Sequence, residues 1–343
     1  MSDIQDARRA ELVITYNGKN ISRELAESLT DFSYTDAAPG SLDDLQISLE
    51  DRGRKWQKDW SPAEGDRIKA EIKVTNWGKA WEIKRLPCGT FEVDSIDFDG
   101  PPDKVSIKAV SLPIDSEARQ EERSKAWEKV TLKTIAADIA KRAKLKLKYE
   151  VKENPKYDRL DQTSQSDLAF LNDTAIKEGI ALKITAGQLV LFGEREFERK
   201  EPVLSIIREQ SDVIGYKFAW STAYAAYRAC EVSFTNSKTK KTTKAFFSPP
   251  GAPKTGPVLK VNEQAENQAE ALRMAEKSLR EKNKEAGKAS LSLAGDIRLA
   301  AGVTINVQGW GRFDGKYLVE SAGHKIGSGG YSTDIEIRKV LGW

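Results

Sequence analysis

The sequence has very few of the residues from which metal sites and disulfide frameworks are built. Its 343 residues include one histidine, two methionines and two cysteines, Cys88 and Cys230, which lie far apart. A zinc site needs three or four converging ligands, mostly cysteine and histidine, and a disulfide framework needs several cysteine pairs. The composition therefore excludes both, and we expect neither a metal nor a cofactor.

A large net charge and long apolar runs are also missing. The 55 Lys and Arg residues nearly balance the 52 Asp and Glu residues, so the formal net charge is only +3. So weak a field does not favour the gathering of DNA or of anionic membrane. No stretch approaches the ~20 apolar residues that span a bilayer, and no apolar signal-peptide core follows the polar residues 1–6. We expect a protein folded in the cytoplasm, with no specific nucleic acid binding and no integral membrane association.

Alternation of apolar and polar residues with period two dominates the chain up to about residue 112. It is clearest in three segments, residues 45–49, 68–74 and 105–109. Such segments are typical of antiparallel strands with one buried face. The phase of the alternation slips near Asp94 and Ser95, which predicts a bulge there. Several short strands with regular turns favour a small antiparallel β-barrel, which we assign to residues 1–112.

The periodicity changes after residue 112, and residues 113–200 predict an α+β insert. Apolar residues recur at helical spacing over residues 132–143, and Thr131 is well placed to cap this helix. A second helix is expected over residues 166–178. The spacing of Ser164 and Asp167 before it resembles a capping box. A short strand at about residues 145–151 between the helices and two short strands in a hairpin after them complete the insert.

Strand periodicity returns in residues 201–343, which we interpret as a second small β-barrel. A long polar helix interrupts it at about residues 263–285, with Glu276 and Arg280 at a spacing that supports a helix. The narrow apolar stripe of this helix comprises Ala265, Ala269, Leu272, Ala275 and Leu279. The predicted fold class is therefore α+β, mainly β, with two antiparallel barrels and an α+β insert between them.

His324 is the first residue to consider for catalysis. A general base needs an orienting partner and a nucleophile or a water within hydrogen-bond reach, and the sequence around His324 offers no nucleophile. A metal site built from His324 and Glu320 would still lack ligands. We interpret His324 as a structural or surface residue.

Pairs of acidic residues raise the possibility of a glycosidase, which needs two carboxyl groups. The candidates are Asp43-Asp44, Glu92 with Asp94, and Asp97 with Asp99. Alternation with apolar residues already explains the charges as a solvated strand face. No nucleophile-elbow, phosphate-loop or metalloprotease motif occurs. The sequence thus predicts no catalytic, cofactor-binding or metal-binding residue and no enzyme.

Two basic runs and several tryptophans are candidates for contacts with partners. The runs, residues 141–148 and 238–244, lack the aromatic platform of a nucleic acid groove, so we interpret them as solvated surface. Trp77, Trp81 and Trp310 lie near glycines in predicted turns. Aromatic residues at loops serve either as interface anchors or as lids on a barrel end, and the sequence leaves both open.

Three stretches of the chain resemble a known family, the phage late-control protein D family. They are residues 165–171 with Glu178-Gly179 and the hairpin at 187–192, the helix around Ala269–Ala275, and the end from Gly302 to Asp334. The end includes Phe313–Tyr317, His324 and Gly330–Asp334. The family comprises baseplate hub proteins of contractile phage tails and is related to the hub half of type VI secretion spike proteins. The resemblance covers essentially the whole chain in order.

The resemblance implies a homotrimer in which each subunit contributes two β-barrels to a ring. Such a ring would match a sixfold tail tube on one side and a threefold central spike on the other, because three copies then present six similar surfaces. The implied partners are the spike, the tail tube, the tape measure and other baseplate proteins, in a virion tail assembled in the host cytoplasm. The alternatives are a tail-associated cell-wall hydrolase and a carbohydrate- or receptor-binding baseplate module.

Overall fold

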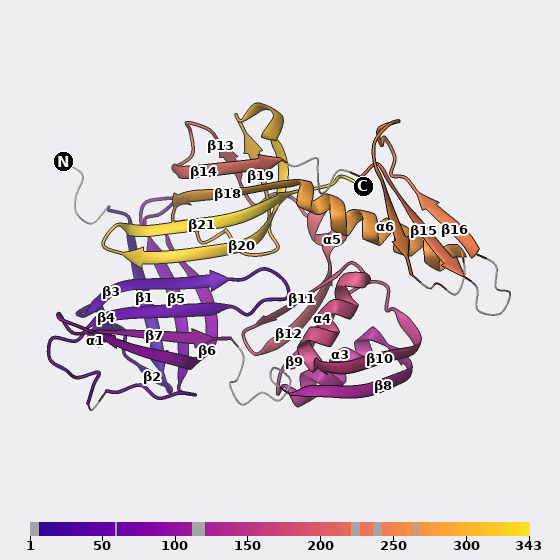
Figure 1. The fold of residues 1–343 in the computed structure, drawn as a ribbon. Coiled ribbons are helices and arrows are strands. Elements are labelled where there is room, and N and C mark those ends of the chain that lie inside the picture. The colour runs from indigo at the N-terminus through magenta and orange to yellow at the C-terminus, as the bar shows by residue number, and fades with distance from the viewer. Residues whose placement is uncertain are drawn as a thin grey trace.

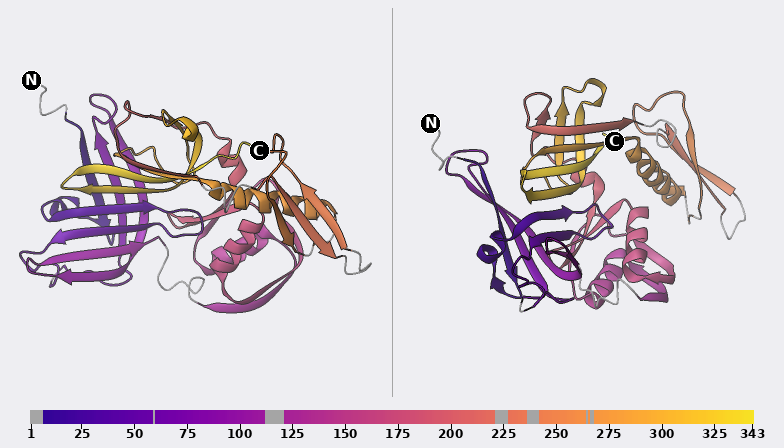
Figure 2. Two further views of the ribbon diagram at one scale, coloured as in Figure 1. Left: turned by 45° about the horizontal axis from the view of Figure 1, so that its top comes forward. Right: turned by 60° about the vertical axis from the view of Figure 1, so that its left-hand side comes forward.

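The computed structural model describes residues 7–58, 60–111, 121–220, 227–235, 242–263, 265 and 268–343 (Figure 1). The structure is mainly β, with 51% strand and 17% helix, as the predicted fold class requires. Two sets of strands lie on one side of the molecule, and two smaller α/β parts lie on the other (Figures 1 and 2). The fold is therefore best understood from one large sheet and the parts attached to it.

Thirteen strands of the described residues form the large sheet, in the order β14-β18-β21-β20-β3-β4-β7-β6-β5-β1-β2, with β19 paired to β20 and β13 paired to β19. The first strand set is β1 (Arg9–Tyr16), β2 (Lys19–Asn20), β3 (Leu29–Asp36), β4 (Asp44–Glu50), β5 (Arg67–Thr75), β6 (Ile83–Asp99) and β7 (Lys104–Val110). The second strand set is β13 (Ser205–Ile207), β14 (Val213–Trp220), β18 (Gly287–Ala294), β19 (Thr304–Gln308), β20 (Gly315–Gly327) and β21 (Gly330–Lys339). Antiparallel pairing of β3 with β20 joins the two strand sets. Because no closed barrel is detected among the described strands, the two closed barrels stay a prediction.

The first strand set agrees closely with the sequence pattern. Its three most regular strands, β4, β5 and β7, coincide with the predicted alternating segments. The register of β6 against β7 shifts between Val93 and Ser95, so the predicted bulge is confirmed. The short helix α1 (Ser22–Ala26) packs beside β1. The sequence pattern is reliable here because β4, β5 and β7 each bury one face in a shared core.

The insert contains two sheets and two main helices. Its elements are β8 (Glu122–Thr131), α3 (Leu132–Arg142), β9 (Lys146–Glu150), β10 (Lys156–Ser166), α4 (Asp167–Lys177), β11 (Ile180–Thr185) and β12 (Gln188–Gly193). Thr131 accepts a hydrogen bond from the Thr134 N–H, which confirms the predicted cap. The predicted capping box is wrong, since Ser166 and not Ser164 caps α4, whereas Ser164 lies within β10. The helix α5 (Glu194–Glu198) leads from the insert to the second strand set.

A separate small unit, the α6 unit, lies between β14 and β18 in the chain. It comprises β15 (Ala229–Thr235), β16 (Thr242–Phe247), β17 (Val258–Asn262) and α6 (Gln268–Asn283). The sequence grouped these strands with the second barrel, but they form their own sheet in the order β16-β15-β17. Two short 3-10 turns, Lys284–Ala286 and Gly311–Phe313, complete the described elements.

The predicted apolar stripe of the long helix is partly wrong. The side chains that α6 buries are Ala271, Ala275 and Leu279, whereas Ala269 and Leu272 are exposed. Residues 264, 266 and 267 of the predicted helix lie outside the described residues. The buried face of α6 differs from the predicted stripe because the small side chains of its alanines allow the helix to lie close to β15 and β16.

Four hydrophobic cores correspond to these parts. The first strand set, the insert, the second strand set and the α6 unit each have a cluster of buried apolar side chains. Tyr331 is an exception, because it belongs to β21 but packs in the core of the first strand set. The two strand sets are thus joined by shared packing as well as by the β3–β20 ladder.

Candidate functional site

His324 is completely buried where the two strand sets meet. It lies on β20, opposite Tyr34 of β3 and Thr333 of β21, and its ring stacks on Tyr34 with 6.0 Å between ring centroids. Its Nε2 lies 3.0 Å from the Leu299 carbonyl oxygen, and its Nδ1 lies 2.8 Å from the Tyr331 hydroxyl. Burial lowers the pKa of His324 below 6.5, so the neutral ring is favoured. His324 is therefore part of the packed structure, in agreement with its interpretation as a structural residue.

Members of two of the acidic pairs considered for a glycosidase are paired with cations. Glu92 pairs with Arg67 at 3.3 Å, and Asp97 lies 3.6 Å from Lys108. Glu320 contacts Arg338 at 3.4 Å and no hydrogen bond joins it to His324 in the described residues. Across the described ranges, no group of three or more His, Cys, Asp or Glu residues could hold a metal ion.

Asp43 belongs instead to a buried cluster that joins the insert to the first strand set. We call it the Lys183 cluster, and it contains Lys183, Asp36 and Asp43. The Lys183 ammonium pairs with Asp36, lies 3.2 Å from Asp43 Oδ1 and donates to the Ala37 carbonyl oxygen at 2.8 Å. The other oxygen of Asp36 accepts the Ala301 N–H at 2.7 Å, so the second strand set is attached as well. Burial raises the pKa of Asp43, against the opposing effect of Lys183.

A second buried cluster joins α5, α6 and the second strand set. We call it the Arg338 cluster, and its members are Arg338, Arg280, Lys284, Glu194, Glu198 and Glu320. Arg338 Nη1 donates to Glu198 at 2.6 Å, and Arg280 Nη2 donates to the other oxygen of Glu198 at 2.6 Å. Lys284 pairs with Glu194 at 3.1 Å. Charge-assisted hydrogen bonds of this kind hold the parts in one geometry.

The basic runs do not form a groove in the described part of the chain. In the first run, Arg142 is bound by Asp138 and by Asp167, the latter at 2.7 Å. In the second run, Lys238, Lys240 and Lys241 lie outside the described residues, and Lys244 pairs with Glu231 at 2.9 Å. Both observations agree with an interpretation as paired or solvated surface.

The three tryptophans singled out in the sequence have different environments. Trp310 is buried and packs on Phe218 with 5.5 Å between ring centroids. Trp77 is half-buried, donates through Nε1 to the Gly295 carbonyl oxygen, and packs on Tyr331 at 5.3 Å. Only Trp81 of the three is exposed, at 69%. Trp310 and Trp77 are thus parts of the packed structure, and Trp81 is the one available for contacts.

The sequence did not single out the exposed apolar residues of β14. Ile214, Tyr216 and Trp220 are 69%, 50% and 44% exposed on a strand that, in the described sheet, pairs only with β18. An unpaired apolar edge strand is available for contact with another chain. Apolar residues occupy both faces of β14, so period-two alternation does not indicate which face is exposed.

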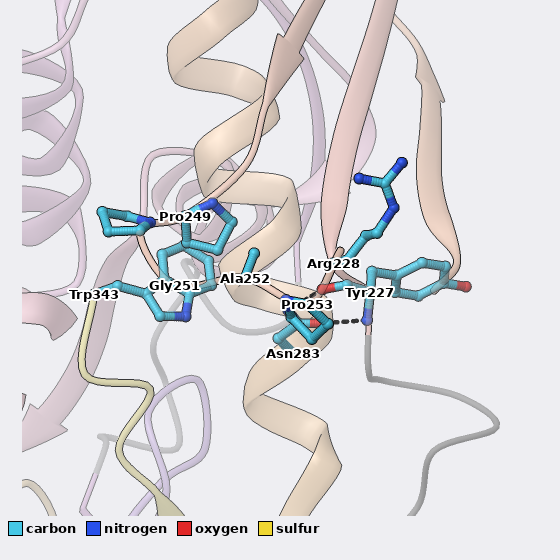
Figure 3. Close-up of a pocket in the computed structure, with 9 residues that line it drawn as sticks. Tyr227, Arg228, Pro249, Gly251, Ala252, Pro253, Asn283 and Trp343 are labelled. Carbon is cyan, nitrogen blue, oxygen red and sulfur yellow. Dashed lines mark hydrogen bonds between the residues drawn. The ribbon is translucent and has the colours of Figure 1, made fainter. Parts of the chain in front are cut away.

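A small hollow lies between the α6 unit and the end of the described chain (Figure 3). Its walls are Tyr227, Arg228, the Pro249–Pro253 loop, Asn283 and Trp343. Asn283, at the end of α6, accepts a hydrogen bond from the Tyr227 N–H at 2.9 Å and donates one to the Tyr227 carbonyl oxygen at 2.8 Å (Figure 3). These two bonds fix the position of Tyr227. No acid–base pair is among these wall residues.

No helix of the described residues has the length and apolar character to cross a membrane.

The chain belongs to the YQBQ-like family, whose pattern matches residues 120–338. It is 27% identical over 212 residues to a protein named probable baseplate hub protein from Escherichia phage 186, covering 60% of this chain and 51% of that protein. It is 24% identical over 225 residues to the protein of the same name from Escherichia phage P2, covering 64% and 55%. The chain therefore spans about half the length of these curated relatives. The resemblance to baseplate hub proteins expected from the sequence is confirmed.

Solved structures extend the similarity of fold to the whole chain. A tail protein from Neisseria meningitidis MC58 matches with a TM-score of 0.72 and 12% identity, covering 96% of this chain and 97% of that one. A component of the Escherichia coli type VI secretion system, described as similar to the phage T4 tail proteins gp27 and gp5, matches with a TM-score of 0.56 and 11% identity, covering 92% and 74%. The TM-scores show a common fold, and at such low identities they show the fold alone.

Proposed function

We propose that this protein is a non-enzymatic baseplate hub of a contractile phage tail or of a tail-like particle. The observation that carries the proposal is the sequence similarity to two curated baseplate hub proteins. The contacts of the candidate residues agree with a scaffold, since His324 and Asp43 are used in packing and in buried ion pairs. The protein would act in the tail baseplate of a virion assembled in the host cytoplasm.

We further propose that three copies form a ring that adapts a sixfold tail tube to a threefold spike. In both strand sets a hairpin lies beside the β3–β20 junction, with a third antiparallel strand on its outer side: β3-β4-β7 in one and β20-β21-β18 in the other. A duplicated arrangement of this kind supports the idea that three chains present six similar surfaces. The partners would be the central spike, the tail tube, the tape measure and other baseplate proteins.

The predicted division of the chain remains part of this proposal. Residues 1–112 and 201–343 would be the two hub domains, with residues 113–200 between them. The α6 unit, with its own sheet and core, would be an insertion in the second hub domain. The exposed apolar residues of β14 would lie in a contact with another protein.

The mass of the purified protein in solution tests the proposal, measured alone and with its spike. The expected mass corresponds to three copies of the 38.2 kDa chain in at least one of these conditions, plus the mass of the spike where the spike is bound. A monomer in both would contradict the hub function. Turnover of peptidoglycan that one acidic substitution abolishes would favour the hydrolase, and glycan binding by a monomer that Trp81→Ala abolishes would favour the receptor-binding module.

A further inference from the structure

The loop between β18 and β19, residues 295–303, is held across the junction of the two strand sets by four hydrogen bonds in which a side chain takes part, in addition to backbone bonds such as that from the Gly295 N–H to the Tyr331 carbonyl oxygen at 2.9 Å. Trp77 Nε1 donates to the Gly295 carbonyl oxygen, and the Asp296 N–H donates to Thr333 Oγ1 at 2.9 Å. His324 lies 3.0 Å from the Leu299 carbonyl oxygen, and the Ala301 N–H donates to Asp36 at 2.7 Å. The anchors come from both strand sets, so this loop, which we call the junction loop, joins them.

His324 is at the centre of these contacts, and its proton must be on Nε2. The Leu299 carbonyl oxygen can only accept a hydrogen bond, so Nε2 is the donor. In the neutral ring Nδ1 is then an acceptor. Two hydroxyls lie near it, Tyr331 at 2.8 Å and Thr333 at 3.3 Å. The Thr333 hydroxyl already accepts from Asp296, which leaves its hydrogen free to point at Nδ1.

Protonation of Nδ1 would turn this acceptor into a donor. The hydroxyl hydrogens of Tyr331 and Thr333 would then both have to turn away, in a place where His324 and Thr333 have no exposed surface. The two hydroxyls belong to the groups that hold the junction. Thr333 anchors the junction loop through Asp296, and the Tyr331 ring packs on Trp77 of the first strand set.

No nearby charge offsets a buried imidazolium through a hydrogen bond. The titratable and charged groups around His324 are Tyr34 and Asp36 of β3, Cys88 of β6, Asp296 of the junction loop and Tyr331 of β21, with Asp43 and Lys183 beyond Asp36. Asp36 is already used by Lys183 and the Ala301 N–H. Asp296 is bound by Arg298 at 2.9 Å.

We propose that His324 is a pH-sensitive latch between the two strand sets, and that its protonation releases the junction loop and Tyr331 from the first strand set. The latch is closed with neutral His324 and opens when Nδ1 gains a proton from the solvent. The inference stands apart from the proposed hub function, because it needs only the contacts within one chain.

The direction in which a fall in pH changes stability distinguishes His324 from the other groups whose pKa is shifted. The folded-state pKa of His324 is below 6.5, so its contribution to stability is present above pH 6.5 and is lost as the pH falls toward the folded value. The pKa values of Asp43 and Glu320 are raised, so their protonation acts in the opposite direction. The carboxyl groups with a lowered pKa, such as Asp334, stabilise the folded state above their ordinary value of 3.8 and lose that contribution only below it. Loss of stability just below pH 6.5 therefore points to His324.

Because the chain has one histidine, NMR of the labelled imidazole follows this residue without ambiguity. We expect a titration midpoint below 6.5 in the wild type and a higher midpoint in Tyr331→Phe, which lacks a donor to Nδ1. Tyr317→Phe is the matched control, because the Tyr317 hydroxyl donates to the Phe313 carbonyl oxygen in the other core. A wild-type midpoint at the ordinary value of about 6.5, or no change in Tyr331→Phe, would overturn the latch.

Hydrogen exchange of the junction loop tests its release. Below pH 6.5 the opening equilibrium, corrected for intrinsic exchange, should rise by up to about tenfold per pH unit, while the β4–β7 ladder stays protected. His324→Gln keeps an amide N–H for Leu299 and an oxygen for the hydroxyls, and it should abolish this dependence. The same pH dependence in His324→Gln would overturn the proposal. If that variant does not fold, the wild-type midpoint of loop opening must coincide with the His324 titration, and a mismatch rejects the latch.

Discussion

The Lys183 cluster and the Arg338 cluster both join separate parts of the chain, but they differ in the ratio of cations to carboxylates. Each is buried, and each joins parts of the chain that are distant in sequence. The Lys183 cluster has one cation for two carboxylates. In the Arg338 cluster, Glu198 is shared by Arg338 and Arg280, and Glu194 is shared by Arg338 and Lys284.

The difference teaches that a junction with one cation depends on that cation, whereas a junction with several tolerates the loss of one. A buried ion pair is weak evidence for stability in itself, but removal of one partner leaves an uncompensated buried charge. In the Lys183 cluster two carboxylates would be left without a cation. In the Arg338 cluster Arg280 and Lys284 would still face the carboxylates.

Lys183→Met should have the largest effect. The substitution leaves Asp36 and Asp43 buried without their cation, and we expect the free energy of unfolding at pH 7.5 to fall by about 3–5 kcal/mol. Urea denaturation followed by fluorescence and by circular dichroism measures it. A smaller fall in the free energy of unfolding for Lys183→Met than for Arg338→Met would contradict the proposed difference between the two clusters.

Arg338→Met should cost less, about 2–3 kcal/mol, because other cations remain beside Glu194 and Glu198. The same denaturation experiment measures it. The double variant Arg338→Met with Arg280→Met removes both cations from Glu198 and should cost more than the sum of the single changes. Additive costs would show that the cations do not replace each other.

Lys183→Met combined with Asp43→Asn should recover part of the stability, to within about 1–2 kcal/mol of the wild type. The amide oxygen of the introduced asparagine can still accept the Ala37 N–H, which Asp43 accepts at 2.9 Å. The single variant Lys183→Met should show the same recovery as the pH falls, because burial raises the pKa of Asp43, so the folded state takes up this proton at a higher pH than the unfolded state does. Denaturation at pH 7.5 and at pH 5 checks this, and equal costs at both would refute it.

Lys325→Met is the matched surface change and should have the smallest effect, within about 1 kcal/mol. Lys325 pairs with Asp334 at 2.8 Å, and both side chains are exposed, at 55% and 41%. Solvent screens this pair, whereas it does not screen the two buried clusters. Thermal denaturation in low and high salt should show only a small shift, and a cost close to that of Lys183→Met would remove the distinction between buried and exposed pairs.

Local features of the fold could be predicted from the sequence, because they depend on neighbouring residues. The strands β4, β5 and β7, the Thr131 cap and the bulge near Ser95 all follow from period and spacing. Apart from the misplaced capping box at Ser164, the errors arose where a partner from elsewhere in the chain decides the structure. Glu276 and Arg280 were expected to pair with each other, but Glu276 pairs with Arg195 and Arg280 with Glu198.

The buried clusters could not be predicted for the same reason. Lys183 and Asp36 are 147 residues apart, and only the fold brings them together. One signal was present, since Lys183 lies within the apolar run of β11, where an unpaired charge would be costly. That signal indicates that a partner exists but does not identify it. The structural place of His324 was correctly expected, although its role at the junction needed the structure.

Electron microscopy of the purified protein, alone and bound to its spike, tests the central claim most directly. We predict ring-shaped particles with three chains around a central opening, whose class averages show threefold symmetry and six similar β lobes. Particles of a single chain in both preparations, or assemblies without threefold symmetry, would contradict the proposal that this protein is a trimeric baseplate hub.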